Sequence, residues 1–473
     1  MKRNSKISTI KRICLALLTS FALLSSSFII PAQAVIKTGS ACKAEGITSE
    51  FSGKTFTCIK SGQKLVWDKG VSRSSSAQFN EIGSTSSTEI CKLADSRVKK
   101  LQPSNVGFPL QEDIIPVKGN INVIVIPVDF SDRPAGQIPI DYLQDQTSKM
   151  NQWYKFFSGD RVSLSFQIGT QWVRAPKADA DYVVPKGVAN APGIAVDIQN
   201  KMAQDIVTAA KNQFDFKKSN VLFFYMPTIK SVDYDMGGRG VSLNTTDGSK
   251  NFFFWGGGAY HFDDRNVKAS LKKEKMWAFW NHEMLHSQGL ALHSPANGSS
   301  SGLQSDQYGS SSAIDSWELF RLGWIDDSNV ACLEKNNTLN NKLILSSTEL
   351  GSRLARFSVI KLNQYEALVV ESRRPIGYSK EWRPDQKGVL VYRIDMRNDN
   401  DRSGEATGDT GNSPNFPKWA YLLSPDGKNL SSLSSFEIER YILRMNQTVT
   451  YSGVKIKVLG SATDKDLVEI SAA

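Results

Sequence analysis

The chain has 473 residues, of which 40% are hydrophobic and 22% are charged, so it can form folded domains and is not an intrinsically disordered protein. Its net charge is +10, but the first 34 residues contain five basic and no acidic side chains, and the remainder carries +5. This mild excess, without a basic stripe interleaved with aromatic residues, argues against a nucleic-acid-binding protein.

Residues 1–34 have the pattern of a secretory signal peptide. A basic segment, Lys2 to Arg12, precedes an apolar one, Ile13 to Ile30, and an Ala-Gln-Ala cleavage site ends at Ala34. An uncleaved anchor helix is the alternative, because the apolar segment is about 18 residues long. No second segment is as long and as apolar. We therefore expect a secreted, extracellular protein, and association with the cell surface stays open.

Four cysteines remain after the predicted cleavage, namely Cys42, Cys58, Cys91 and Cys332. An even number in an exported chain predicts two disulfides, for which three pairings exist. We favour Cys42–Cys58, which closes a short loop, together with Cys91–Cys332. The sequence has no C-x-x-C motif, which argues against a thiolate zinc site and against a redox motif.

Changes in composition divide the chain into segments. Residues 35–70 predict a small module of short strands with one Cys pair, which is either a contact with the cell envelope or a plain spacer. Residues 71–90 are rich in Ser and Thr and predict a flexible linker. Residues 91–345 predict a mixed domain that we expect to be catalytic, and residues 346–473 a β-rich region.

The domain at 91–345 alternates strands with helices. Ile121 to Phe130 is a continuous apolar run that predicts a buried strand, and Val162 to Ile168 alternates like a second strand. Apolar residues recur every four positions from Ile194 to Ile206, which predicts an amphipathic helix. Val221 to Met226 predicts another buried strand, and Gly237 to Leu243 an edge strand beside a cleft. An α+β fold follows.

After about residue 340 helical periodicity is scarce. Four segments predict strands, and they are Ala367–Glu371, Gly388–Ile394, Val449–Val458 and Asp466–Ile470.

Three of the four histidines fall within twelve residues, and two of them form an H-E-x-x-H motif, His282-Glu283-x-x-His286. On a helix, positions i and i+4 share a face and are about 6 Å apart along the axis, so two imidazoles can bind one Zn²⁺. Glu283 lies beside them, where it can act as a general base. The segment from Lys272 to His286 lacks Gly and Pro, and Gly289 permits an irregular exit from the helix.

Several residues are candidates for further roles. We favour His293 as the third zinc ligand, with Asp306 and Glu318 as competitors. His261 follows a Gly-rich segment and either lines the cleft or is a surface histidine. Tyr308 is a candidate hydrogen-bond donor to a reaction oxyanion, or an ordinary surface tyrosine.

Beyond this motif, the chain resembles the immune inhibitor A-type (M6) zinc metalloproteases. The similar segments, which lie in about the same order over residues 120–470, are Val123–Asp132, Trp153–Asp160, Ile314–Ile325, Glu366–Arg373 and Gly388–Asp395. The resemblance implies a metzincin-like catalytic domain, a twisted sheet plus an active-site helix, and endopeptidase activity.

The same resemblance assigns His282 and His286 as metal ligands and Glu283 as the base. The chain departs from the family at two places. Leu292 occupies the usual third-ligand position, one residue before His293, and no Met lies between His293 and Trp317 where a Met-turn is expected.

The sequence therefore predicts a secreted zinc endopeptidase that acts as a monomer on protein or peptide substrates. The alternatives are a non-catalytic cell-surface binding protein on a degenerate protease scaffold and a zinc hydrolase of non-peptide polymers. A loop with Asp395, Asp399, Asp401 and Asp409 has oxygen ligands suited to Ca²⁺, but it fails the EF-hand spacing, and we favour a solvated loop.

Overall fold

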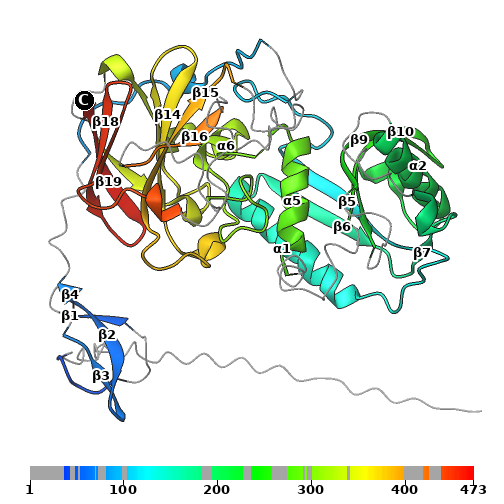
Figure 1. Cartoon of the computed structure of the whole chain (residues 1–473), viewed down its shortest axis with the longest axis horizontal. Coiled ribbons are helices and arrows are strands. Elements are labelled where there is room, and N and C mark those ends of the chain that lie inside the picture. Colours follow the sequence, from blue (N-terminus) through cyan, green and yellow to red (C-terminus); the bar gives the residue numbers. More distant parts are fainter. Residues whose placement is uncertain are drawn as a thin grey trace, which may run out of the picture. The chain divides into compact units, whose positions relative to one another are not determined.

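The computed structural model describes residues 37–42, 48–51, 54–69, 71–72, 81–98, 104–182, 194–226, 236–257, 274–290, 293–295, 301–337, 341–398, 419–425 and 438–473. The predicted signal peptide, His261 and the aspartates 399, 401 and 409 lie outside these residues. The chain divides into two compact units, Met1–Ser76 and Ala77–Ala473, which are described separately (Figure 1).

The smaller unit is a four-stranded antiparallel sheet in which β2 pairs with each of the other strands. A disulfide joins Cys42 to Cys58 of β2, with the two Cα atoms 5.8 Å apart, which confirms the predicted pairing. The strands are β1 (Thr48–Phe51), β2 (Lys54–Ser61), β3 (Lys64–Trp67) and β4 (Val71–Ser72).

The larger unit begins with a six-stranded sheet in the order β6-β5-β8-β10-β9, with β7 paired to β5. Strands β5, β6, β8 and β10 are parallel, whereas β9 is antiparallel to β10 and lies at the end of the order. The strands are β5 (Gly119–Asp129), β6 (Val162–Ile168), β7 (Val173–Arg174), β8 (Val221–Tyr225), β9 (Met236–Thr245) and β10 (Gly248–Gly257).

Helices cover both faces of this sheet, as a parallel sheet requires (Figure 1). Alternate residues of β5 divide between two cores. Val123 and Val125 share one with α1 (Ile140–Ser158) and α5 (Met276–Ser287). Ile124 and Ile126 share the other with α2 (Ile194–Ala209). This burial on both sides explains why β5 is a continuous apolar run.

The C-terminal part consists of two packed sheets. A five-stranded sheet has the order β11-β13-β14-β15-β16 and a four-stranded sheet the order β12-β19-β18-β17, with one apolar core between them. The strands are β11 (Val330–Glu334), β12 (Asn341–Ser346), β13 (Phe357–Lys361), β14 (Glu366–Arg373), β15 (Gly388–Asp395), β16 (Ala420–Leu422), β17 (Thr448–Tyr451), β18 (Val454–Ser461) and β19 (Lys465–Ala472).

The prediction of one strand over Val449–Val458 is wrong. The segment is a hairpin of β17 and β18, which pair antiparallel around a turn at Ser452 and Gly453. Both turn residues have positive φ, 49° and 77°. Such angles reverse the chain and are readily adopted by glycine, and the apolar residues on either side hid this reversal in the sequence.

The five-stranded sheet also packs against the part of the unit that contains α5. Val369 of β14 and Tyr392 of β15 belong to the same core as Trp280 of α5 and Trp317 of α6 (Ser316–Arg321). A second disulfide, Cys91–Cys332, joins the 3-10 turn Thr88–Cys91 to β11 and confirms the other predicted pairing.

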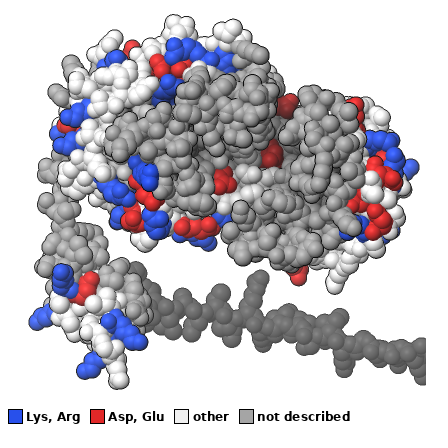
Figure 2. Space-filling model, in the orientation of Figure 1, with Lys and Arg blue, Asp and Glu red and all other residues white. Residues whose placement is uncertain are grey.

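Residues at the end of the predicted linker pair with the C-terminal sheets. Ile82 forms a β-bridge with Lys342, and Ser86 forms one with Cys332. In the described part of the chain, no helix has the length and apolar character needed to cross a membrane. On the face drawn in Figure 2, basic and acidic side chains of the described residues intermingle.

The remaining short helices are 3-10 turns. They are Asp179–Tyr182, Phe216–Lys218, Asp327–Asn329, Lys335–Asn337, Thr348–Leu350, Gly377–Ser379 and Ile438–Arg440.

Candidate metal centre

Helix α5 is buried on most of its circumference, which fixes the direction of its polar side chains. Trp280 stacks on Phe223 of β8, with ring centroids 4.2 Å apart and planes 10° apart. Leu285 is fully buried in the same core. His282 and His286, one turn apart, lie on one face of this helix, and their rings are 4.6 Å apart.

Each of these two imidazoles is oriented by a backbone carbonyl. Nδ1 of His282 lies 2.9 Å from the Leu303 oxygen, and Nδ1 of His286 lies 3.2 Å from the Leu290 oxygen. A carbonyl oxygen only accepts a hydrogen bond, so Nδ1 of each neutral ring carries the hydrogen and Nε2 keeps its electron pair. The two Nε2 atoms are 3.1 Å apart.

His293 completes a group of three potential ligands. Its ring stacks on that of His282, with centroids 5.1 Å apart and planes 16° apart, and one nitrogen of each of the three rings lies within 4.8 Å of the others. Two nitrogens bound to a tetrahedral zinc ion at about 2.0–2.1 Å are separated by about 3.3 Å. The 3.1 Å between the Nε2 atoms of His282 and His286 therefore fits such an ion.

Gly289 turns the chain just after α5, on the way to His293. Its φ is +99°, and a Cβ there would collide with the backbone oxygen of Gln111. Only glycine adopts this positive φ and permits this close approach without strain. Leu292, the position at which the family has its third ligand, lies outside the described residues.

Glu283 lies next to the edge strand β9. A Cβ built on Gly238 would be 3.0 Å from Oε2 of Glu283, so the carboxylate faces the strand at a point where no side chain intervenes. Glu283 is half-buried, and His282 beside it is 1% exposed. The carboxylate, the histidines of α5 and the outer strand are thus neighbours.

The two competing ligands are engaged elsewhere. Asp306 accepts a hydrogen bond from its neighbour's amide, Tyr308 N, at 2.9 Å, and burial raises the pKa of its carboxyl group. Glu318 forms a fully buried ion pair with Arg321 at 3.0 Å. Burial raises the pKa of Glu318, and the guanidinium opposes that rise. Among the described residues, the three histidines are the one group of His, Cys, Asp or Glu that could hold a metal ion.

Two further candidates are partly described. Tyr308 stacks on Phe279 of α5, with centroids 5.5 Å apart and planes 8° apart, so its ring packs one turn from His282. Asp395, at the start of the acidic loop for which a solvated state was favoured over a Ca²⁺ site, binds Arg397 at 2.8 Å, which holds its pKa below the usual range despite burial. Its carboxylate already has a cation.

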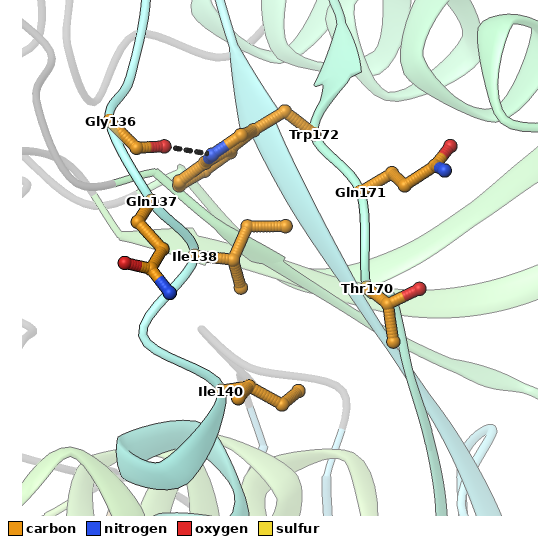
Figure 3. A pocket seen from close by; sticks show the side chains of 7 residues that line it. All are labelled: Gly136, Gln137, Ile138, Ile140, Thr170, Gln171 and Trp172. Carbon is orange, nitrogen blue, oxygen red and sulfur yellow. Dashed lines mark hydrogen bonds between the residues drawn. The ribbon is translucent and has the colours of Figure 1, made fainter.

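A cavity of about 470 Å³ lies where the chain leaves β5 and β6 (Figure 3). Trp172 crosses its rim and donates from Nε1 to the Gly136 oxygen at 2.6 Å. The other lining residues are Gln137, Ile138, Ile140, Thr170 and Gln171. None of these side chains titrates near neutral pH or is a usual zinc ligand, so the cavity is separate in chemistry from the metal centre.

No family model and no curated relative matches this chain. Solved structures of OgpA from Akkermansia muciniphila are similar at a distance. The wild-type enzyme has 13% identity and a TM-score of 0.27 over 62% of this chain and 89% of its own. The catalytically inactive form, in complex with an O-glycopeptide substrate, has 13% identity and a TM-score of 0.26 over 62% and 88%.

Sequence reasoning missed the groups that orient the ring nitrogens. The carbonyls of Leu290 and Leu303 belong to the backbone and have no signature in side-chain types. Gly238 was part of the predicted edge strand, but its place against Glu283 depends on a long-range contact. Its neighbour Gly237 was the available signal, because consecutive glycines in a strand indicate a close approach of the backbone.

Proposed function

We propose that this protein is a secreted zinc-dependent endopeptidase with a metzincin-like catalytic domain. The observation that carries the proposal is the convergence of His282, His286 and His293 beside Glu283 at an outer strand. The sheet of five parallel strands with one antiparallel strand at its end, packed on the helix that bears the motif, supports the family resemblance.

Zinc is the metal that suits this donor set, because three neutral imidazoles with an open fourth position are typical of catalytic zinc sites. A bound zinc ion supplies Lewis acidity, which lowers the pKa of water and polarises a substrate carbonyl. Each ring offers one nitrogen, and in His282 and His286 this is Nε2, because Nδ1 is hydrogen-bonded to a carbonyl oxygen.

Glu283 is placed to move the proton. Its carboxylate accepts a proton from the attacking water and delivers it to the leaving amine, and it stands beside the ligand His282 and against Gly238. The adjacent strand β9 is the outermost of the described strands in the sheet order. An extended peptide added to that edge would bring its scissile bond past the carboxylate.

The test is hydrolysis of an unstructured protein such as casein by the exported chain. We expect cleavage by the wild type, loss of cleavage after chelation, and recovery on adding zinc. Glu283→Gln keeps the shape of the side chain and removes the base, so it should retain zinc and lose activity.

Other outcomes would favour the alternatives. Bound zinc with hydrolysis of glycans but not of proteins would indicate a hydrolase of non-peptide polymers. A chain that binds no zinc and hydrolyses neither proteins nor glycans would support the alternative of a non-catalytic binding protein. Secretion is tested separately, by the N-terminal sequence of the exported protein, which we expect to begin at Val35.

A further inference from the structure

The orientation of the two α5 imidazoles depends on two carbonyls that lie outside any helix or strand. Leu290 follows α5, and Leu303 lies in the segment between His293 and α6. A loop carbonyl orients a metal ligand only when its own segment is held in place. Mutation of such partners of metal ligands typically weakens metal binding by about 10–100-fold. The question is therefore what holds these two segments.

The segment that contains Leu303 is held by Arg373, the last residue of β14. One arm of this guanidinium donates to the Ser301 oxygen at 2.5 Å, two residues before Leu303. Arg373 is fully buried. The amide of Leu303 donates to the Ala313 oxygen at 2.7 Å, so the backbone that leads to the acceptor of His282 is held at two points.

Arg373 is itself fixed by three carboxylates from separate parts of the chain. It binds Glu349 at 2.7 Å, Glu371 at 3.0 Å and Asp315 at 3.4 Å. Its guanidinium also lies 5.0 Å from the ring of Trp382. This set of partners uses the planar fork of arginine, which a lysine ammonium cannot reproduce.

The segment that contains Leu290 is held in the same way by Arg321 of α6. Its guanidinium donates to the Gly289 oxygen at 3.2 Å, one residue before Leu290, and also to the Asn105 oxygen. Glu318 binds the other arm at 3.0 Å, and both side chains are fully buried. Glu318, which the sequence offered as an alternative third zinc ligand, therefore orients this arginine.

We propose that Arg373 and Arg321 are positioning residues of the metal centre, each holding the loop whose carbonyl orients one zinc-binding histidine. This inference rests on the proposed zinc site. It gives a role to two segments of the family resemblance, 366–373 and 314–325, that the catalytic residues do not explain. Through Arg373 the C-terminal sheets contribute to metal affinity.

Arg373→Lys and Arg321→Lys test this proposal, with Arg374→Lys as the matched control. Arg374 is the next residue, is also buried and pairs with Asp466 at 2.9 Å. Its guanidinium donates to the Arg373 oxygen and to carbonyls of 462–465, between β18 and β19, instead of to the segments of Leu290 and Leu303. Each lysine keeps the buried positive charge. All three variants should unfold at a lower temperature in the metal-free state.

Zinc affinity, measured by competition with a chromophoric chelator, separates the roles. We expect a dissociation constant raised about 10–100-fold in Arg373→Lys and Arg321→Lys, with an altered Co²⁺ absorption spectrum, and an unchanged constant in Arg374→Lys. Wild-type affinity in the first two variants, or equal weakening in all three, would overturn the proposal. A wild-type protein that binds no zinc would instead overturn the proposed function. If Arg373→Lys does not fold, Arg321→Lys decides the matter alone.

Discussion

Neighbouring side chains of helix α5 have different roles in the proposed zinc site. His282 and His286 point one nitrogen each toward a common position, and Glu283 between them faces Gly238. An i, i+4 pair brackets the metal position, and the intervening acid is displaced around the helix toward the outer strand. The metal and the proton acceptor thus occupy adjacent but separate places.

Glu283→Gln should separate binding from chemistry. The amide cannot accept the proton of the attacking water, so we expect kcat to fall by about 10²–10⁴-fold, the usual contribution of a general base. Zinc content and thermal stability should stay at wild-type values. Activity assays beside elemental analysis provide the check, and an active Glu283→Gln enzyme would contradict the assigned role.

At the scale of elements, the exit from α5 is the critical feature, because Leu290 and His293 both follow it. We expect Gly289→Ala to destabilise the fold by about 1–3 kcal/mol, since φ is +99° and the Cβ would collide with the Gln111 oxygen. Zinc affinity should fall as well, because the Leu290 carbonyl moves with the turn.

Gly323→Ala is the control for this substitution. Gly323 also has positive φ, +63°, but a Cβ there meets no atom within 4 Å. Gly323→Ala should lower the free energy of unfolding by about 1–2 kcal/mol, because of the left-handed backbone alone, and leave zinc affinity unchanged. Chemical denaturation and chelator competition measure both quantities. Equal zinc affinities in the two variants would show that the turn after α5 does not orient His286.

The elements also show which parts of the fold were readable in the sequence. The apolar run of β5 and the four-residue period of α2 predicted those elements, because burial on two faces or on one stripe leaves a direct pattern. The hairpin of β17 and β18 was missed because apolar and polar residues alternate on both sides of its turn at Ser452 and Gly453, as they would in one continuous strand.

The candidate site was only partly readable for a related reason. The spacing of His282, Glu283 and His286 is local, so the motif reveals it. Gly289, which precedes His293, packs against the Gln111 backbone, and the segments of the carbonyl acceptors contact arginines far along the chain. These are tertiary contacts, and no periodicity in the sequence encodes them.

At the scale of the whole molecule, the two disulfides stabilise different units. Cys91–Cys332 closes a separation of 241 residues within the larger unit, and Cys42–Cys58 one of 16 within the smaller. Removing Cys91–Cys332 by double substitution to Ser should lower the stability of the larger unit by about 2–5 kcal/mol. Differential scanning calorimetry measures this as an earlier main transition.

Replacing both Cys42 and Cys58 by Ser is the matched control. Because the smaller unit is compact by itself, the main transition and zinc affinity should be unchanged. A main transition shifted equally by both double variants would show that the two units unfold together. Proteolysis near Ser76 gives a second check, since the released larger unit should keep its zinc.

Elemental analysis of the exported protein tests whether three histidines hold one zinc ion. It compares the zinc content of the wild type, His293→Ala and Asp306→Ala. We expect one zinc per chain in the wild type and in Asp306→Ala, and a clear loss in His293→Ala, because the ligand atoms of His293, His282 and His286 lie within 4.8 Å of one another. Full zinc in His293→Ala with loss in Asp306→Ala would move the third ligand to Asp306. A wild-type protein without zinc under metal-replete conditions would show that the three histidines do not form a zinc site.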